Sequence, residues 1–178
     1  AAGGVGQIFC QWAKSLGCSV IGTVGSDEKI DIAKKFGCDH VINYSKDDFQ
    51  KKVMEITNEE GLPVVYDGVG KVTMEKSLGC LKMRGTFVSF GNASGKLDPL
   101  DVGKLIAPKG LFLTRPSIAH YTATRKELDE AANKLFEMVK LKKVKIDIFK
   151  KYSLNDVIYA HRDLEGRKII GPAIIVPN

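Results

Sequence analysis

Short β-branched and apolar runs alternate along the chain with stretches in which apolar residues recur every three or four positions. The runs predict strands over residues 19–24, 40–43, 63–67, 86–90 and 111–114. The periodic stretches predict helices over residues 5–16, 27–36, 47–57 and 72–81. A strand followed by a helix, repeated at intervals of roughly 20 to 25 residues, is typical of βα units. The pattern therefore predicts an α/β fold with a parallel sheet.

The first helical stretch is the most informative. Its apolar positions form a single stripe, made of Val5, Ile8, Phe9, Trp12, Ala13 and Leu16. Residues 1–6, just before the stripe, fit the dinucleotide-binding pattern A-x-G-x-x-G. In that pattern Gly3 lets the backbone approach a pyrophosphate, and Gly6 lets the helix pack tightly on a sheet. The amides and the positive dipole end of the helix then hold the phosphates.

The end of the next strand bears on which nucleotide binds. A NAD site places Asp or Glu there to hold the ribose hydroxyls, but this strand ends at Val24 and runs into Gly25. Asp27 and Glu28 come later, in the first turn of the following helix, where acids complement the helix dipole. Ser26 is the expected N-cap of that helix.

An alternative interpretation gives Ser26 and Lys29 to a 2′-phosphate, because a hydroxyl and an ammonium group suit a dianion. Tyr44, just past the strand predicted over residues 40–43, would lie alongside the adenosine. Together these positions favour NADPH over NADH.

Composition narrows the classes of function. With 178 residues, 44% of them hydrophobic, the chain is long enough for one domain or one and part of another. No apolar run is long enough for a membrane span, and no signal sequence opens the chain. The net charge of +6 comes from lysines spread along amphipathic stretches, which indicates a solvated surface. We expect no membrane and no nucleic acid as partner.

The four cysteines, Cys10, Cys18, Cys38 and Cys80, form no C-x-x-C pair and have no His at ligand spacing. They predict buried, reduced thiols in a cytoplasmic protein and no metal site. The sequence opens in mid-motif without an initiator Met, from which we expect a fragment of a longer protein.

Several longer motifs occur in order along the chain: AAGGVGQIFCQWAKSLG, IGTVGS, VINY, VVYDGVG, GTFVSFGNASG, TRPS and RKIIGPAIIVP. Together they resemble the NADPH-dependent quinone oxidoreductases, the zeta-crystallin-like, zinc-free branch of the medium-chain dehydrogenase/reductase superfamily. The resemblance implies a Rossmann-type doubly wound parallel sheet, a homodimer, and hydride transfer from NADPH to quinones or related conjugated carbonyls.

The resemblance also implies a division of the chain. Residues 1–143 would form an NADP-binding Rossmann domain that lacks its first strand. Residues 144–178 would return to a GroES-like catalytic domain that is absent. On this interpretation the complete protein is an NADPH:quinone oxidoreductase, and this fragment alone is inactive.

Carried over position by position, the resemblance implies four groups of cofactor contacts. They surround the pyrophosphate, the 2′-phosphate with the adenosine, the nicotinamide ribose, and the crevice after the strand predicted over residues 86–90. In that order the residues are Gly3, Gly4, Val5 and Gly6; Ser26, Lys29 and Tyr44; Val69 and Gly70; and Phe90, Gly91 and Asn92. Arg167 resembles a late arginine that is a second phosphate ligand.

Simpler interpretations stay open for some of these residues. Phe90 ends an apolar strand and is alternatively core. Arg167 is alternatively a surface charge, and residues 92–95 an ordinary turn.

No catalytic residue can be nominated. His40 and His120 have no Ser, Cys or Asp at triad-like positions. His161 lies on an apolar helical stripe after a candidate N-cap, Ser153, which favours a core or interdomain role. The other members of that stripe are Leu154, Val157, Ala160 and Leu164.

Two other functions remain as alternatives. One is a non-catalytic, crystallin-like nucleotide-binding protein. The other is a different Rossmann enzyme such as a methyltransferase. Such an enzyme normally has an acid at the end of the strand predicted over residues 19–24, and none follows Val24.

Overall fold

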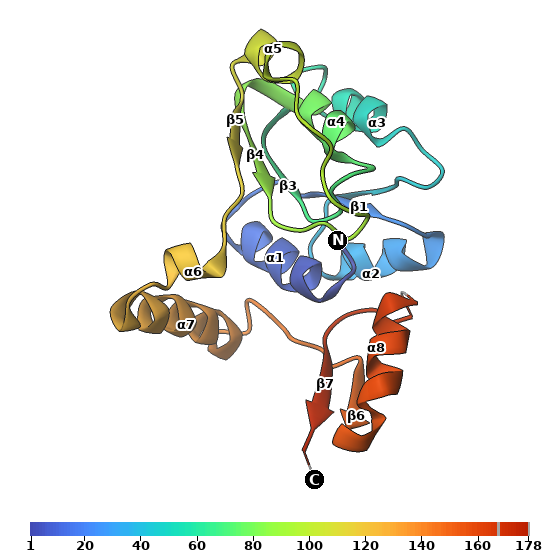
Figure 1. Cartoon of the computed structure of the whole chain (residues 1–178), viewed down its shortest axis with the longest axis vertical. Helices are drawn as coiled ribbons and strands as arrows, with labels where there is room; N and C mark the ends of the chain where they lie inside the picture. The colour runs from blue at the N-terminus through green and yellow to red at the C-terminus, as the bar shows by residue number, and fades with distance from the viewer. Residues whose placement is uncertain (167, 178) are drawn as a thin grey trace. The chain divides into compact units, whose positions relative to one another are not determined.

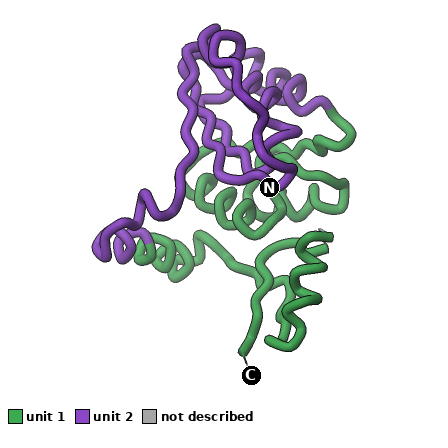
Figure 2. The backbone as a smooth tube through the Cα atoms, in the orientation of Figure 1, with its two compact units in different colours: residues 1–47, 132–178 green, residues 48–131 purple. Residues whose placement is uncertain are grey.

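The computed structural model describes residues 1–166 and 168–177. The chain divides into two compact units, residues 1–47 with 132–178, and residues 48–131 (Figure 2). The helix α7 (Arg125–Lys140) runs from the second unit into the first. Each unit is an arrangement of helices with parallel strands (Figure 1). The predicted α/β class with parallel strands is confirmed.

The first unit opens with a helix, a strand, a helix and a strand. In order they are α1 (Gly4–Ser15), β1 (Ile21–Val24), α2 (Ile30–Lys35) and β2 (His40–Asn43), with the short 3-10 turn η1 (Asp27–Lys29) before α2. β1 and β2 pair in parallel, with Ile21 opposite His40 and Val24 opposite Asn43. Their core is small, made of Ala2, Cys10, Val20, Val24, Ala33 and Cys38.

The last part of the chain adds a second parallel pair to this unit. Its elements are β6 (Lys150–Ser153), the 3-10 turn η3 (Leu154–Asp156), α8 (Val157–Glu165) and β7 (Ala173–Val176). β6 pairs with β7, and α8 is tied to β6 because the Tyr152 hydroxyl and the Lys150 ammonium both donate to Asp163, at 2.8 and 2.9 Å.

The second unit contains a three-stranded parallel sheet in the order β3-β4-β5. Its elements are α3 (Phe49–Ile56), β3 (Leu62–Asp67), α4 (Met74–Gly79), β4 (Leu81–Ser89), α5 (Val102–Leu105), the 3-10 turn η2 (Ala107–Lys109), β5 (Phe112–Thr114) and α6 (Ile118–Tyr121). The core under this sheet consists of Met74, Leu78, Leu81, Phe87 and Leu111. α3 and α4 lie side by side (Figure 1).

Local capping explains where several helices begin. The Asp48 carboxylate accepts the backbone N–H groups of Gln50 and Lys51, at 3.1 and 3.3 Å, and starts α3. At α6 the Ser117 hydroxyl accepts the Ala119 N–H, while the Ser117 N–H donates to Nδ1 of His120 at 3.4 Å. His120 is therefore a capping residue in the described structure.

The helix predicted over residues 72–81 is wrong at its end. α4 stops at Gly79, and Leu81 already belongs to β4, which is longer than the strand predicted over 86–90. The reason is a long-range contact, since the Leu62 N–H donates to the Cys80 carbonyl at 2.8 Å and Leu81 pairs with Leu62.

The apolar stripe of α1 is only partly buried, with Ala13 packed against the core and Val5, Phe9 and Leu16 exposed. Gln7 and Cys10 are the buried residues of α1, whereas Val5 and Leu16 are 64% and 71% exposed. Gln7 is held inward because its side-chain amide donates to the Ala2 carbonyl at 2.8 Å.

Three further predictions need correction. Cys18 is exposed, while the other three cysteines are buried and all four are free. α8 has no buried residue, so a core role for His161 is wrong and an interdomain role stays a prediction. Ser153 occupies the N-cap position of η3, but its hydroxyl donates to Asp156 at 2.7 Å instead of capping a backbone N–H.

Among the described residues, no helix combines the length and the apolar character that crossing a membrane requires.

Candidate functional site

The glycine turn before α1 contains two glycines with different surroundings. An added Cβ at Gly6 would overlap the Ala1 carbonyl group, so the chain itself requires glycine there. An added Cβ at Gly3 would meet no atom of the described residues within 4 Å, and the φ of −76° and ψ of 172° at Gly3 suit any residue. The chain's own packing therefore does not explain the glycine at position 3.

The N-terminus of α1 carries no negative side chain. Gly3 is the N-cap and offers no capping group, and the first turn contains no acid. The first N–H groups of a helix lack partners within the helix, and together with the dipole they attract anions. The first turn of α1 is thus chemically suited to a phosphate.

A segment far along the chain lies against this turn. An added Cβ at Gly4 would lie 3.5 Å from the nitrogen of Pro172, and one at Gly171 would lie 3.0 Å from Nε2 of Gln7. Sequence reasoning missed this contact, because nothing local connects positions so far apart. Arg167, the predicted second phosphate ligand, lies outside the described residues.

The ends of β1 and β2 bring the predicted adenosine residues to one edge of this sheet. The two strands are parallel and finish at paired residues, Val24 and Asn43. An added Cβ at Gly25 would lie 2.9 Å from the Tyr44 hydroxyl, so the tyrosine side chain lies against Gly25. The Ser45 hydroxyl donates to the Gly25 carbonyl at 2.9 Å and closes the contact.

Asp27 connects these two strand ends. Its carboxylate accepts the Asn43 side-chain amide at 2.6 Å and pairs with the Lys46 ammonium. The pKa of Asp27 is lowered from its ordinary value, first by Lys46 and then by Asn43. The Asp27 carboxylate therefore holds the loop after β2 that carries Lys46. The sequence predicted only that Asp27 complements the helix dipole.

Ser26 and Lys29 flank Asp27 and are both half-buried. Ser26 has the extended backbone of an N-cap, with φ −158° and ψ 158°, so its predicted position is confirmed. Its hydroxyl, however, donates to Glu28 at 3.2 Å and caps no backbone N–H.

The loop after β3 is organised by Asp67, which sequence reasoning did not single out. This buried carboxylate accepts the N–H groups of Val69 and Gly70, at 2.8 and 2.9 Å. It also accepts the hydroxyls of Thr73 and Ser77, both at 2.8 Å. The available signal was the acid at a strand end followed by G-V-G, which is typical of a tight turn.

The loops after β3 and β4 are in backbone contact. The Ala93 N–H donates to the Gly68 carbonyl at 3.2 Å, and the Ser94 N–H donates to the Val69 carbonyl at 2.8 Å. An added Cβ at Gly91 would lie 2.7 Å from the Gly68 carbonyl oxygen, so only glycine fits there. The structure thus brings together four of the predicted residues: Val69, Gly70, Gly91 and Asn92.

Phe90 lies in the same place but is not core. It is 45% exposed, and its ring lies over Gly68, where an added Cβ would come within 2.7 Å of it. The core interpretation of Phe90 is therefore wrong. The turn interpretation of residues 92–95 has its hydrogen bond, from the Gly95 N–H to the Asn92 carbonyl at 3.0 Å.

Beside this loop pair, Arg115 at the end of β5 donates to the buried Ser89 hydroxyl at 2.9 Å. The predicted cofactor contacts between positions 3 and 44 belong to the first unit. The predicted contacts between Val69 and Asn92 belong to the second unit.

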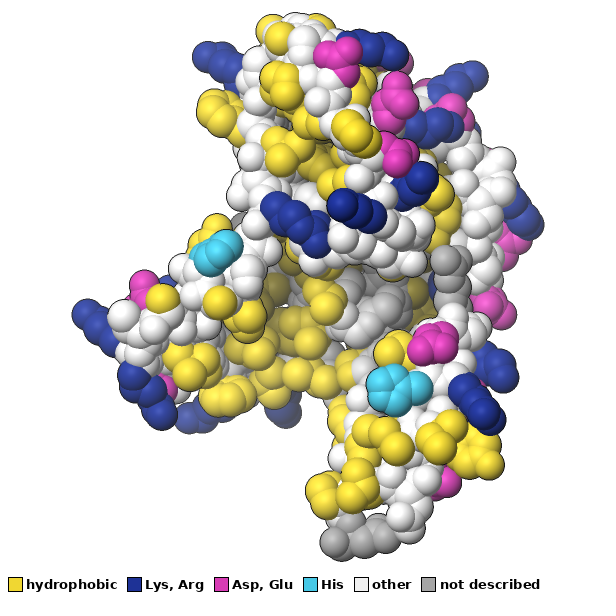
Figure 3. All heavy atoms as spheres, viewed as in Figure 1, with side chains coloured by type: hydrophobic (Ala, Val, Ile, Leu, Met, Phe, Trp, Pro, Cys, Tyr) yellow, Lys and Arg dark blue, Asp and Glu magenta, His cyan; other side chains and the backbone are white. Residues whose placement is uncertain are grey.

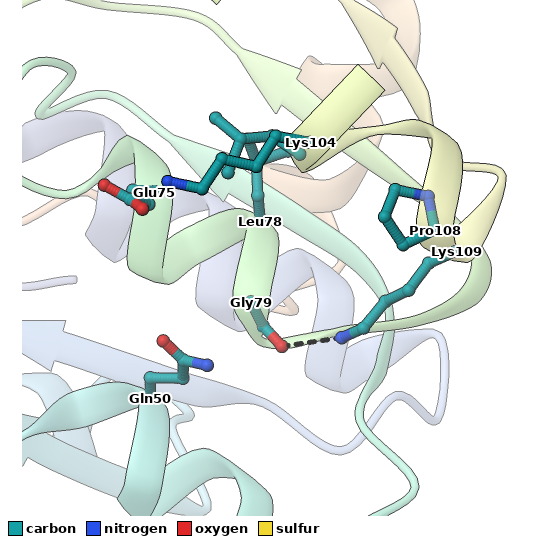
Figure 4. Close-up of a pocket in the computed structure, with 8 residues that line it drawn as sticks. Gln50, Glu75, Leu78, Gly79, Lys104, Pro108 and Lys109 are labelled. Atoms are coloured by element: carbon teal, nitrogen blue, oxygen red, sulfur yellow. Dashed lines mark hydrogen bonds between the residues drawn. The ribbon is translucent and has the colours of Figure 1, made fainter. Parts of the chain in front are cut away.

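A separate pocket of about 260 Å³ opens in the second unit among α3, α4, α5 and η2 (Figure 4). Its polar lining includes Gln50, Glu75, Lys104 and Lys109, and Lys109 donates to the Gly79 carbonyl at 2.8 Å. None of the predicted site residues that the structure describes lines it.

Comparison with known proteins places the chain in a family. The family model described as zinc-binding dehydrogenase matches residues 4–137. The chain belongs to this family. It is also a homologue of quinone oxidoreductases, which confirms the resemblance drawn from its motifs.

Two curated relatives match almost the whole chain. Quinone oxidoreductase 1 of Escherichia coli (strain K12) is 46% identical over 99% of this chain and 55% of its own length. A 2-haloacrylate reductase of a Burkholderia species is 44% identical over 100% of this chain and 54% of its own length. The chain thus spans about half the length of the curated relatives it matches.

The fold agrees with that relationship. The crystal structure of Escherichia coli quinone oxidoreductase complexed with NADPH superposes with a TM-score of 0.95 and 46% identity, covering 99% of this chain and 55% of that one. The chain therefore matches part of an NADPH-complexed reductase structure.

The description of the family names zinc. Within residues 1–166 and 168–177, no group of three or more His, Cys, Asp or Glu side chains could hold a metal ion. A zinc centre does not fit the described residues, since zinc takes three or four such ligands.

Proposed function

We propose that this chain is the NADPH-binding part of an enzyme that reduces quinones or related conjugated carbonyls by hydride transfer. The observation that carries the proposal is the open space at Gly3, beside the first turn of α1, where no atom of residues 1–166 and 168–177 lies within 4 Å of an added Cβ. A pyrophosphate needs that close approach to the backbone. The relative whose structure is described as a complex with NADPH supports the choice of cofactor.

The roles of the residues follow from their positions. Gly3, Gly4, Val5 and Gly6 would hold the pyrophosphate through backbone N–H groups. In the same unit, the Lys29 ammonium and the Ser26 hydroxyl would bind the 2′-phosphate, with the Tyr44 ring alongside the adenosine. No acid follows Val24 directly, so the position from which an acid would hold the ribose hydroxyls of NAD is empty of one.

The residues of the second unit would serve the other end of the cofactor. Val69 and Gly70 would pass the nicotinamide ribose, and Phe90, Gly91 and Asn92 would border the crevice. Bound NADPH would supply the hydride, while the chain's part is to bind and orient it and to exclude water. We nominate no proton donor, and we propose that solvent protonates the developing oxyanion.

The proposal includes the wider organisation of the protein. Residues 1–143 would be a Rossmann-type, doubly wound NADP-binding domain and residues 144–178 a segment joining a second, catalytic domain. We further propose a homodimer that works in the cytoplasm. Because the relatives are about twice as long, we expect residues 1–178 alone to show weak turnover or none.

The kinship with a 2-haloacrylate reductase supports a second substrate class within the same chemistry. An acrylate carries a carbon–carbon double bond conjugated to a carboxyl group, and hydride addition to it resembles addition to a quinone. An assay of NADPH oxidation with a quinone and with a 2-haloacrylate, using the complete protein, separates the two.

Titration of NADPH and NADH into the chain, followed by nucleotide fluorescence, tests the cofactor assignment. We expect NADPH to bind more tightly, and Lys29→Ala to weaken NADPH binding by about 10-fold or more, the effect of losing a charge-assisted hydrogen bond. The affinity for NADH should stay unchanged in that variant. The matched control is Lys34→Ala, an exposed lysine of α2. Equal affinities for the two nucleotides, or equal effects of the two variants, would refute the assignment.

A further inference from the structure

Two cysteine thiols face each other in the core of the first unit. Cys10 lies on α1 and Cys38 lies between α2 and β2, 28 positions further along the chain. The Cys38 thiol donates to the Cys10 sulfur at 3.5 Å, and the two residues are 7% and 4% exposed. Both are free, and the proposed function uses neither of them.

The backbone around the pair holds the two sulfurs toward each other. Gly37 has φ +102°, and an added Cβ there would lie 3.1 Å from the Cys10 carbonyl oxygen, so the turn before Cys38 lies directly on α1. One helical turn further, Lys14 pairs with Asp39, and Asp39 also accepts the Val20 N–H at 2.9 Å. Both sides of the sulfur pair are therefore fixed.

The strand β1 forms the floor under Cys38. An added Cβ at Gly22 would lie 2.5 Å from the Cys38 sulfur, so this sulfur rests on a glycine backbone. The backbone of β1 therefore blocks movement of the Cys38 sulfur in that direction. A disulfide bond is about 2.05 Å long, so the sulfurs need to approach by roughly 1.5 Å.

The chemistry of the two thiols is unequal. The pKa of Cys10 is lowered to about 7, first because Cys38 donates a hydrogen bond to its sulfur, while the pKa of Cys38 is raised by the same contact. Burial raises the pKa of Cys80 to about 12. The thiolate is the nucleophilic form, so Cys10 is the attacking sulfur of the pair.

We propose that Cys10 and Cys38 form a reversible disulfide when the protein meets hydrogen peroxide, an oxidant small enough to reach buried sulfurs. The Cys10 thiolate attacks one peroxide oxygen, the O–O bond breaks, and hydroxide leaves and becomes water, which gives a sulfenic acid on Cys10. The Cys38 sulfur then attacks the Cys10 sulfur, the S–O bond breaks, and the hydroxyl group leaves with the Cys38 proton as water. Two thiols are oxidised by two electrons, one peroxide is reduced to two waters, and a dithiol reductant reverses the reaction.

The test uses the full chain of 178 residues, treated with hydrogen peroxide in native buffer. Remaining thiols are then alkylated in denaturant, and the digested protein is mapped by mass spectrometry. We expect a linked Cys10–Cys38 peptide, about 2 Da lighter than its two parts and absent after a dithiol reductant. Cys80 should carry the alkyl group. A disulfide that joins Cys18 or Cys80, or Cys10 and Cys38 both alkylated after Cys18 has been oxidised, would overturn the proposal.

Two variants sharpen the test. Cys38→Ala should lower the yield of disulfide at Cys10 by at least about 10-fold and leave a sulfenic acid there that dimedone traps, since the resolving thiol is gone. Cys80→Ala, which removes a buried cysteine outside the pair, should leave the yield unchanged. Similar losses in both variants would refute the pairing, and the mapping of the unsubstituted chain decides the question even where a variant fails to fold.

Discussion

At the residue scale, a glycine is required either by the chain's own packing or by something that approaches from outside, and Gly6 and Gly3 differ in this respect. An added Cβ at Gly6 would overlap the Ala1 carbonyl, whereas one at Gly3 would meet nothing within 4 Å in the part of the chain that the structure describes. Neither glycine has a positive φ, so backbone strain explains neither. The pattern A-x-G-x-x-G shows only the residue type, and the structure separates the two causes.

This difference predicts unequal effects on stability. Gly6→Ala should lower the free energy of unfolding by about 1–3 kcal/mol, because α1 must shift away from Ala1. Gly3→Ala should lower it by less than about 1 kcal/mol, the cost of alanine at an N-cap, while weakening NADPH binding. Urea unfolding followed by the fluorescence of Trp12, the single tryptophan, measures the free energy of unfolding of both variants. Equal losses of stability would contradict the assignment.

A second prediction at this scale concerns Asp39 and pH. Its pKa is lowered below the ordinary 3.8, first by Lys14 and then by the Val20 N–H. A carboxyl with a lowered pKa stabilises the folded chain above its unfolded-state pKa and loses that effect as the pH falls through its folded-state value. Asp39→Asn should therefore lower the urea midpoint at neutral pH, and the difference from the unsubstituted chain should shrink as the pH falls below 3.8.

The matched control for that series is Asp98→Asn. Asp98 forms an exposed ion pair with Lys71, and such pairs contribute little to stability. Its midpoint should follow that of the unsubstituted chain at every pH. A deficit of Asp39→Asn that stays constant with pH would refute the electrostatic explanation.

At the element scale, one buried carboxylate fixes the connection from β3 to α4. Asp67 accepts four hydrogen bonds, from Val69, Gly70, Thr73 and Ser77, all at 2.8–2.9 Å. One carboxylate oxygen accepts the two backbone N–H groups and the other accepts the two hydroxyls, so the carboxylate satisfies all four donors. The same turn presents the Gly68 and Val69 carbonyls to the loop after β4.

Asp67→Asn should therefore destabilise the chain, because the neutral asparagine replaces an oxygen that accepts two of the four hydrogen bonds with an NH2 group. We expect a loss of about 1.5–3 kcal/mol, the range for hydrogen bonds to a charged group. Asp101→Asn is the matched control, since Asp101 caps α5 in solvent and asparagine caps equally well. Urea unfolding monitored by circular dichroism measures both variants, and equal stability of the two would show that Asp67 is not the organising group.

The same scale shows how far the sequence predicts this fold. The strand at residues 40–43 was predicted with its observed bounds, because a β-branched run between turn signals is a local property. The end of α4 was predicted wrongly, because Leu81 begins a strand through its pairing with Leu62, which no local pattern records. Long-range pairing overrides helical periodicity at that point.

The candidate site divides in the same way. The glycine turn and the adenosine edge could be predicted, because small residues at fixed spacing and strand ends are visible in the sequence. The hub at Asp67 and the contact of residues 171–172 with α1 could not, since they depend on which segments meet in space. The apolar stripe of α1 did not indicate that Gln7 is buried. Its side-chain amide is satisfied by the Ala2 carbonyl, so it can be buried as an apolar side chain would be.

At the scale of the whole molecule, exposed charges and exposed apolar side chains both occur on many elements. Figure 3 shows Lys and Arg side chains at several separate places on the visible face, many of them near Asp or Glu. This distribution agrees with a solvated surface, and the absence of a nucleic-acid partner stays a prediction. Large apolar side chains are exposed on many elements, among them β5, where Phe112 and Leu113 are 62% and 44% exposed.

The strand β5 is the place where we expect two copies of the chain to associate. It lies at one edge of the order β3-β4-β5, and all of its residues are exposed. An edge strand offers backbone hydrogen-bonding groups to another chain, and apolar side chains increase the gain from pairing. The proposed homodimer could use this edge, because two copies related by a two-fold axis would pair it with itself.

Leu113→Lys should therefore weaken association by about 10- to 100-fold, because a charge replaces a side chain worth about 1.5–3 kcal/mol on burial. Sedimentation velocity over a series of protein concentrations measures the effect. Leu113 is already partly exposed in the single chain, so its replacement should leave the fold intact, as circular dichroism will show. Phe136→Lys is the control, because this residue is 65% exposed on α7, outside the sheet. If Phe136→Lys separates the copies and Leu113→Lys does not, the interface lies on the helix and the edge of β5 is not used.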